Sequence, residues 1–368
     1  MRLVEETRVV GEIVDRVILV PVYIGSALAK KPLILDLYDA ARCRFGEPLT
    51  YLAADKLLSA AKAGRTVIIA TGFIVPPWLA PETDGPVGAV TLAKSLNLGF
   101  DLTPVIVTDD VLVEKVSRLC EAGGFRVFDY KRATVLPRRA AVESFPVDEE
   151  KARREAEALL DRVKPTALIA IERASRNDLG QYHTGVGFNI TKFTSKVDFL
   201  FDEARRRGIV TIGIGDGGNE IGMGCIKEAV KRYVPTATNC GCPCGAGTHA
   251  ATETDVLIVA SVSNWGAYGL EACLAHAFRR LELLHEPEEE ENLLEEAAHL
   301  GFIDPATGFS GPSVDHIPKE IHTSILRMLR YVVKSRLGES IYIEKYRAYS
   351  KENRTSIQNL IDNWKEYM

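Results

Sequence analysis

The residues best placed for chemistry lie in a glycine-rich segment, GIGDGGNEIGMG, at residues 213–224. Six of these twelve residues are glycine, which costs backbone entropy and is tolerated where a loop turns tightly or approaches a ligand. Asp216, Asn219 and Glu220 supply oxygen atoms at spacings that share one face of a helical turn. Such oxygens suit a divalent cation, Mg²⁺ or Mn²⁺, or an ammonium group, and the alternative is a glycine turn with a capping aspartate. We predict a metal bound by Asp216 and Glu220, both also catalytic candidates, and a substrate contacted by Gly217, Gly218 and Asn219.

The same loop matches the dinucleotide-binding pattern G-x-G-x-x-G through Gly213, Gly215 and Gly218. The carboxylate of Asp216 would oppose a pyrophosphate at this position. No second strand ending in an acid follows about 20 residues later, as that fold requires. We therefore expect neither a nicotinamide nor a flavin cofactor.

A second loop follows the apolar run TVIIA and begins with Thr71 and Gly72. Asp84 fits the N-cap of a helix and Pro86 its first turn, so helix initiation alone explains part of this motif. Glu82 is not needed for capping and is a catalytic candidate. Thr71, Gly72 and Asp84 are predicted to contact the substrate.

A third loop begins with Glu172 directly after the buried run ALIAI. Arg173 and Arg176 are spaced so that they could grip a carboxylate or a phosphate, and Tyr182 lies in the same loop. Glu172 is a catalytic candidate, and the other three residues are predicted to bind substrate. The alternative is a Glu–Arg pair that only ties down a long loop. His183 by itself does not indicate a site.

A fourth loop, at residues 261–269, precedes a helix whose N-terminus would attract an anionic group. Ser263 or Asn264 can cap that helix, and Asn264 is a further predicted substrate contact.

Four of the seven cysteines fall within twenty residues of one another: Cys225, Cys240, Cys242 and Cys244. With His249 downstream, they could form a separate structural site for zinc or an iron–sulfur cluster. The usual C-x₂-C spacing is absent, so reduced buried thiols or a local disulfide are favoured over a metal.

These loops need a sheet to position them, and short apolar runs alternate with helical patterns through the middle of the chain. This order predicts a doubly wound, mostly parallel α/β sheet of Rossmann-like type with helical N- and C-terminal additions. We divide the chain into a helical segment (1–64), an α/β core carrying the ligand loops (65–262) and a helical part packed on the core (263–368), together one extended domain. The predicted strands are residues 66–70, 105–108, 126–128, 167–171, 209–214 and 256–260. The predicted helices are residues 49–63, 87–98, 111–122, 148–163, 195–207, 265–285, 288–299 and 317–337, with a terminal helix packed on the surface.

Composition excludes several classes of protein. The balance of 45 basic and 50 acidic residues, a net charge of −5, argues against nucleic-acid binding and against a polybasic membrane patch. Pro21 interrupts the longest apolar run near the start, which is too short to span a bilayer. Acidic residues stand where a targeting segment would have none, so we expect a cytoplasmic protein without a membrane or nucleic-acid partner, and a homo-oligomer is possible.

Four motifs, in this order, resemble the D-glutamate cyclase C-terminal-domain-like family, as in its stand-alone microbial members. They are TGFIVPPWLAPETDGPVGA, the ER…R…Y loop, GDGGNEIGMG and SNWGAYGL, and the similarity runs from about residue 50 to residue 330. The resemblance implies a lyase that converts D-glutamate, or a related acidic amino acid, to 5-oxo-D-proline with loss of water. The cysteine cluster is not part of the shared pattern.

The residues can be assigned to that chemistry. A cation held by Asp216 and Glu220 would polarise the γ-carboxylate, and Arg173 or Arg176 would hold the α-carboxylate. Glu172 or Glu82 would take the proton from the amine. Two alternatives stay open, an enzyme for a phosphorylated or nucleotide substrate and a ligand-binding module without catalysis.

Overall fold

The computed structural model describes residues 5–21, 33–62, 65–338, 348–363 and 365. Seven parallel strands form the central sheet in the order β5-β6-β4-β1-β7-β8-β9. This sheet confirms the predicted doubly wound α/β class. The strands are β1 (Thr66–Thr71), β4 (Thr103–Thr108), β5 (Arg126–Val127), β6 (Arg139–Ser144), β7 (Ala167–Ile171), β8 (Val210–Gly215) and β9 (Val256–Val259).

Helices cover both faces of the sheet because the central strands are apolar on both sides. In β1, Val67 and Ile69 enter one core, whereas Ile68 and Ala70 enter the other. Successive side chains of a strand point to opposite faces, so a continuous apolar run needs cover on each.

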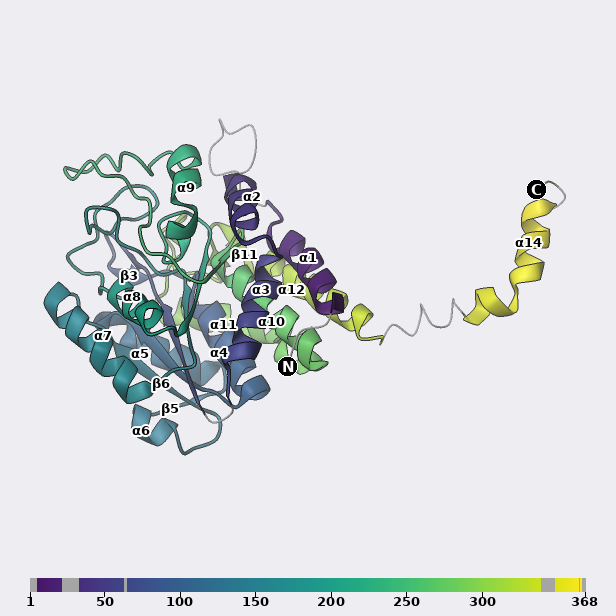
Figure 1. Cartoon of the computed structure of the whole chain (residues 1–368), viewed down its shortest axis with the longest axis horizontal. Helices are drawn as coiled ribbons and strands as arrows, with labels where there is room; N and C mark the ends of the chain where they lie inside the picture. Colours follow the sequence, from purple (N-terminus) through teal and green to yellow (C-terminus); the bar gives the residue numbers. More distant parts are fainter. Residues whose placement is uncertain (1–4, 22–32, 63–64, 339–347, 364, 366–368) are drawn as a thin grey trace.

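The larger core lies under α4 (Pro86–Phe100) and α10 (Ser263–Phe278), which pack against each other (Figure 1). Around them lie α1 (Glu5–Ile18), α2 (Leu33–Phe45), α3 (Leu49–Ala60), α5 (Val113–Ala122), α9 (Lys227–Tyr233), α11 (Pro287–His299) and α12 (Lys319–Arg336). The opposite face is covered by α7 (Glu149–Val163) and α8 (Asp198–Arg206), and α6 (Tyr130–Ala133) lies near β6.

The structure differs from the predicted elements at several places. Strand β6 is not predicted, because its sequence RAAVES has one β-branched residue and carries charges at Arg139 and Glu143. Helix α10 begins at Ser263 and ends at Phe278, where Arg279 adopts a left-handed conformation, rather than running over 265–285. Two short hairpins are also unpredicted, β2 (Ile74–Val75) with β3 (Ala80–Pro81) and β10 (Ser313–Val314) with β11 (Ile317–Pro318).

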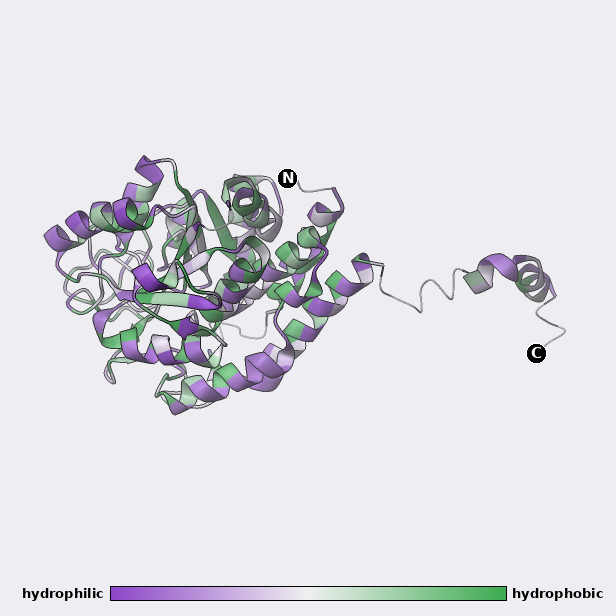
Figure 2. Ribbon diagram, turned by 90° about the horizontal axis from the view of Figure 1, so that it is seen from below, coloured by the Kyte–Doolittle hydropathy of each residue, from purple (hydrophilic) through white to green (hydrophobic). Residues whose placement is uncertain are grey.

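The C-terminal helix α14 (Arg354–Asp362) stands apart from the rest of the protein in both views (Figures 1 and 2). We expected a terminal helix packed on the surface. Its residues alternate between hydrophilic and hydrophobic in Figure 2, and Ile361 is exposed.

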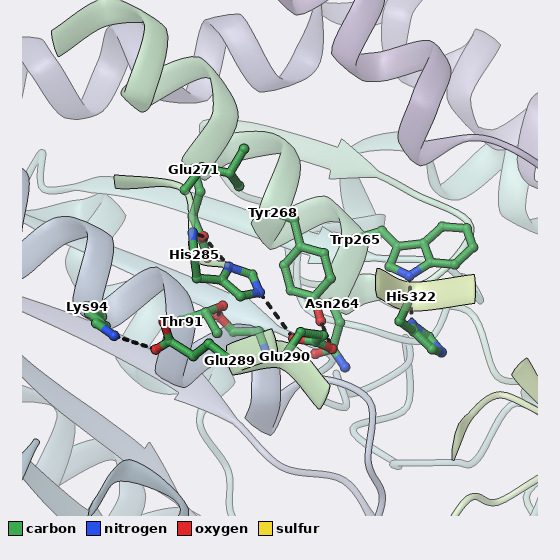
Figure 3. Close-up of polar contacts among 12 residues, drawn as sticks. Thr91, Lys94, Asn264, Trp265, Tyr268, Glu271, His285, Glu289, Glu290 and His322 are labelled. Atoms are coloured by element: carbon green, nitrogen blue, oxygen red, sulfur yellow. Dashed lines mark hydrogen bonds and ion pairs between the residues drawn. The ribbon is translucent and has the colours of Figure 1, made fainter. Parts of the chain in front are cut away.

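A buried polar network joins α10 to α11 and to the segment between them (Figure 3). His285 lies between two glutamates: Nδ1 is 2.7 Å from Glu271 Oε2 and Nε2 is 3.1 Å from Glu290 Oε2. Tyr268 donates to the other oxygen of Glu290 at 2.5 Å. Burial lowers the pKa of His285, but the two carboxylates outweigh it and raise that pKa to about 10. The imidazole is therefore charged at neutral pH.

Candidate active site

The four loops predicted to carry chemistry follow adjacent strands β1, β7, β8 and β9, and so leave the sheet at one edge. After β1 the chain builds β4, β5 and β6 on one side and then crosses to β7 on the other side. Ligands of open α/β sheets bind at such a switch point, beyond the carboxyl ends of the strands. The fold therefore places the loops where a ligand is expected.

A pocket of about 560 Å³ opens at this edge. Its polar lining is dominated by five acids, Glu82, Glu172, Asp216, Glu220 and Asp315. Its apolar walls include Phe73, Trp78, Val186 and Phe188. None of the described residues that line it is a lysine or an arginine. The pocket is therefore strongly acidic, with apolar walls.

The acids converge closely enough to share a cation. One oxygen each from Glu172, Asp216 and Glu220 lie within 4.8 Å of one another, and so do oxygens of Asp84, Asp216 and Asp315. Asp216 belongs to both groups. Hard divalent cations prefer such oxygen ligands, so the residues fit a Mg²⁺ or Mn²⁺ ion.

Backbone and hydroxyl groups fix two of these carboxylates. Glu220 accepts hydrogen bonds from the backbone N–H groups of Gly217 and Gly218, both at 2.8 Å. Glu172 accepts a hydrogen bond of 2.6 Å from the hydroxyl of Ser263. The glycine loop thus bends its own N–H groups onto Glu220, which orients that side chain at the pocket.

Asp84 and Asn264 cap each other's helices. Asp84 accepts from the backbone N–H groups of Ser263 and Asn264, at the start of α10. Asn264 Oδ1 accepts from those of Gly85 and Gly88, at the start of α4. Each residue was expected to cap its own helix. Neither lines the pocket, and their hydrogen bonds hold the starts of α4 and α10 beside it.

Burial raises the pKa of every carboxyl group in the cluster, and neighbouring carboxylates raise the pKa of most of them further. The pKa values of Glu82, Glu172, Asp216 and Asp315 lie well above the usual range for these reasons. For Asp84, burial outweighs three backbone N–H donors and raises the pKa to about 7. Glu82 Oε1 is buried without a hydrogen-bond partner among the described residues. Burial therefore favours the protonated forms of these carboxyl groups, and Asp84 exchanges its proton near neutral pH.

The two arginines do not reach the pocket, which corrects the prediction that they hold the substrate. Arg173 is fully buried, pairs with Asp109 through both Nη atoms and also donates to Ser195. Arg176 pairs with Asp202 at 2.6 Å, on α8. Their partners lie far away in sequence, so local spacing gave no sign of them.

Four other predicted contacts also lie outside the pocket lining, and the first is Gly218, whose N–H donates to Glu220. Tyr182 is buried and donates to Asp198 at 2.6 Å. Gly72 uses its carbonyl to accept from Arg173 at 2.6 Å, and Thr71 is buried beneath Gly85. Gly85 needs its glycine, because its φ is +92° and a Cβ would lie 2.7 Å from that of Glu172.

Asp315 is a pocket acid that the sequence analysis does not single out. It lies in the tight turn between β10 and β11, at φ +50°. Neighbouring backbone is held by Asp304, which accepts from the N–H of His316 at 2.9 Å. An aspartate in a short hairpin far from the sheet strands carries no spacing signal, so only the fold reveals it.

The cysteine cluster differs in membership from the predicted one. Cys225 lies apart and donates to the carbonyl of Thr254 at 3.1 Å, and His249 pairs with Asp178 at 2.9 Å. His183 instead joins Cys240, Cys242 and Cys244.

Comparison with known proteins shows which family the chain belongs to. Residues 36–330 match the family described as D-glutamate cyclase-like, C-terminal. The chain belongs to this family. The human protein named D-glutamate cyclase, mitochondrial, is 33% identical over 238 residues, which cover 61% of this chain and 35% of that protein. The D-glutamate cyclase-like similarity thus spans about a third of the human relative. Among the described residues, no helix is long and apolar enough to cross a membrane.

Proposed function

We propose that this D-glutamate cyclase-like chain is a lyase that converts D-glutamate to 5-oxo-D-proline and water, with a divalent cation in the acidic pocket. The observation that carries the proposal is the convergence of five carboxylates in a pocket whose described lining has no lysine or arginine. A substrate with two carboxylates would be repelled there unless a cation offset the charge. The name of the human relative supports the choice of substrate.

Asp216 is the central ligand in this account, with Glu172 and Glu220 on one side and Asp315 on the other. When bound, Mg²⁺ or Mn²⁺ would act as a Lewis acid at a carboxylate oxygen. The acids left free would attract the ammonium group of the substrate. A flexible amino acid held at both ends becomes an intramolecular reactant, which raises its effective concentration.

The pocket acids also supply the proton transfers. Ring closure takes two protons from the nitrogen, and the departing γ-carboxylate oxygen needs two protons to leave as water. Burial and the neighbouring carboxylates raise the pKa values of Glu82 and Glu172 well above the usual range, which favours uptake of a proton by either side chain. Glu82, whose Oε1 lacks a hydrogen-bond partner among the described residues, is our first choice for this role.

Turnover is the direct test. The purified chain is incubated with D-glutamate and Mn²⁺, and 5-oxo-D-proline is measured by chiral chromatography. We expect product from D-glutamate but not from L-glutamate, and a loss of about 10²-fold or more in Glu82→Gln. Glu157→Gln, an exposed acid on α7, is the matched control and should keep full activity. Equal activity of Glu82→Gln and the control would remove Glu82 from the chemistry.

The two alternative functions predict different results. A nucleotide or phosphorylated substrate would need the helix N-termini, but those of α4 and α10 are occupied by Asn264 and Asp84. A ligand-binding module without catalysis would bind D-glutamate and give no product. The cytoplasmic location and a homo-oligomeric state stay predictions.

A further inference from the structure

A second cluster of metal-binding side chains lies beside the pocket. It comprises His183, Cys240, Cys242 and Cys244, whose ligand atoms all lie within 4.8 Å of one another. His183 Nε2 is 3.3 Å from the sulfur atoms of both Cys242 and Cys244. His183 is buried, with only 1% of its surface exposed. The D-glutamate cyclase reaction proposed above uses none of these residues.

We propose that these four residues bind one structural zinc ion. The three sulfur atoms lie 3.1, 3.2 and 3.4 Å apart. Around a tetrahedral zinc with Zn–S bonds of about 2.3 Å, the sulfur atoms would be about 3.8 Å apart. An outward shift of about half an ångström per pair would therefore admit the ion.

The close spacing favours one ion over a cluster. In an iron–sulfur cluster the cysteines ligate different iron atoms, which would hold several of the sulfur atoms well beyond the observed separations. Three thiolates and an imidazole are the soft and borderline ligands that select zinc. Four protein ligands leave no open position, which is the pattern of a structural site rather than a catalytic one.

The backbone brings the ligands together without a C-x₂-C motif. Gly241, between the first two cysteines, has a φ of +73°, which lets the chain turn sharply. The histidine loop approaches so closely that a Cβ on Gly187 would lie 2.1 Å from the carbonyl oxygen of Cys240. A hydrogen bond of 2.8 Å from Thr236 to the carbonyl of Gly185 joins the two segments. Alternate residues of C-x-C-x-C can then face one ion.

This zinc would also stiffen the wall of the acidic pocket. Thr184, Val186 and Phe188 line the pocket and come directly after His183. The carbonyl of His183 accepts a hydrogen bond of 3.0 Å from Asn219, in the glycine-rich loop. The zinc-bound histidine would therefore anchor both the wall and the loop that carries Glu220.

Metal content tests the proposal without any activity assay. The purified chain is dialysed against zinc-free buffer, and its metals are measured by plasma mass spectrometry. We expect about one zinc per chain in the wild type and in the control Cys43→Ser, an exposed thiol outside the cluster. The zinc content of Cys242→Ser should be lower than that of the wild type by about tenfold or more. His183→Cys should keep its zinc because four ligands remain. Replacement by Co²⁺ should give the thiolate charge-transfer and tetrahedral absorption bands.

Several results would overturn the zinc site. One is iron, copper or no metal in the wild type. Another is full zinc in Cys242→Ser. A third is five rather than seven free thiols in denaturant without reductant, because a disulfide would remove two of the seven cysteines. If Cys242→Ser does not fold, the wild-type metal content and His183→Cys decide the matter.

Discussion

Replacing Asn264 with alanine should destabilise the protein by removing the link between the two helix N-termini that flank the site. Asn264 is fully buried, and its Oδ1 accepts from Gly85 N at 2.9 Å and from Gly88 N at 2.8 Å. Its Nδ2 donates to the carbonyl of Thr83 at 3.2 Å. Alanine would remove all three bonds and would leave the Gly88 N–H and the Thr83 carbonyl without these partners, whereas the Gly85 N–H would keep Asp84 Oδ1 at 2.9 Å.

The size of the effect follows from these three bonds. A buried polar group left without a partner costs about 1–3 kcal/mol. A water molecule entering the vacated space would restore part of this, so we expect Asn264→Ala to lower the free energy of unfolding by about 3 kcal/mol. The measurement is urea denaturation followed by circular dichroism, with the midpoint shifting and the slope unchanged.

Asn97→Ala is the matched control at the other end of α4. Asn97 makes one buried hydrogen bond, from Nδ2 to the carbonyl of Leu102 at 2.8 Å, so its loss should cost about 1 kcal/mol. Equal losses in the two variants, or a loss below about 1 kcal/mol for Asn264→Ala, would refute the mutual capping of α4 and α10 as a source of stability.

Three further predictions concern buried charge. Asp109→Ala leaves Arg173 buried without its carboxylate and should cost about 3–5 kcal/mol in urea denaturation. The pKa of His285 is about 10 in the folded protein and 6.5 when unfolded, so its contribution to stability is complete below pH 6.5 and is lost as pH rises toward 10. The free energy of unfolding should therefore fall between pH 7 and 10, and this part of the fall should be absent in His285→Gln. Burial raises the pKa of the pocket acids, and it raises the pKa of Asp84, whose carboxylate lies beside those of Asp216 and Asp315, to about 7. Mn²⁺ should therefore displace protons and bind more tightly as pH rises from 6 to 8, as measured by calorimetry in two buffers.

Each of these has a result that contradicts it. Asp110→Ala, which replaces the exposed neighbour, should lower the free energy of unfolding little. An equally small decrease in Asp109→Ala would mean that the buried ion pair does not stabilise the fold. An unchanged pH slope in His285→Gln would mean that the histidine is not charged in the folded protein. Mn²⁺ affinity independent of pH would mean that the acids are already ionised.

The fold class and four of the five pocket acids could be predicted because both leave local signals. Apolar runs of strand length predict buried parallel strands, and parallel strands bring the residues after them to one edge. Glu82, Glu172, Asp216 and Glu220 follow three such runs and do meet in the pocket.

What could not be predicted depends on partners distant in sequence. Spacing suggested that Arg173 faced a ligand, but Asp109 accepts from both of its Nη atoms. Asp109 follows β4, which is separated from β7 by β1 in the sheet. By sequence, Asp84 is suited to cap α4 and Asn264 to cap α10. Because α4 packs on α10, Asp84 instead caps α10 and Asn264 caps α4. A histidine among polar residues gives no hint that three cysteines will meet it.

The central claim is that the acidic pocket binds D-glutamate through a divalent cation, and linked calorimetry tests it most directly. D-glutamate is titrated into the chain with and without saturating Mn²⁺, and into Asp216→Asn with Mn²⁺. We predict binding only by the wild type with Mn²⁺, because Asp216 lies in both groups of converging oxygens. Equal D-glutamate binding with and without Mn²⁺, or by Asp216→Asn, would contradict the account.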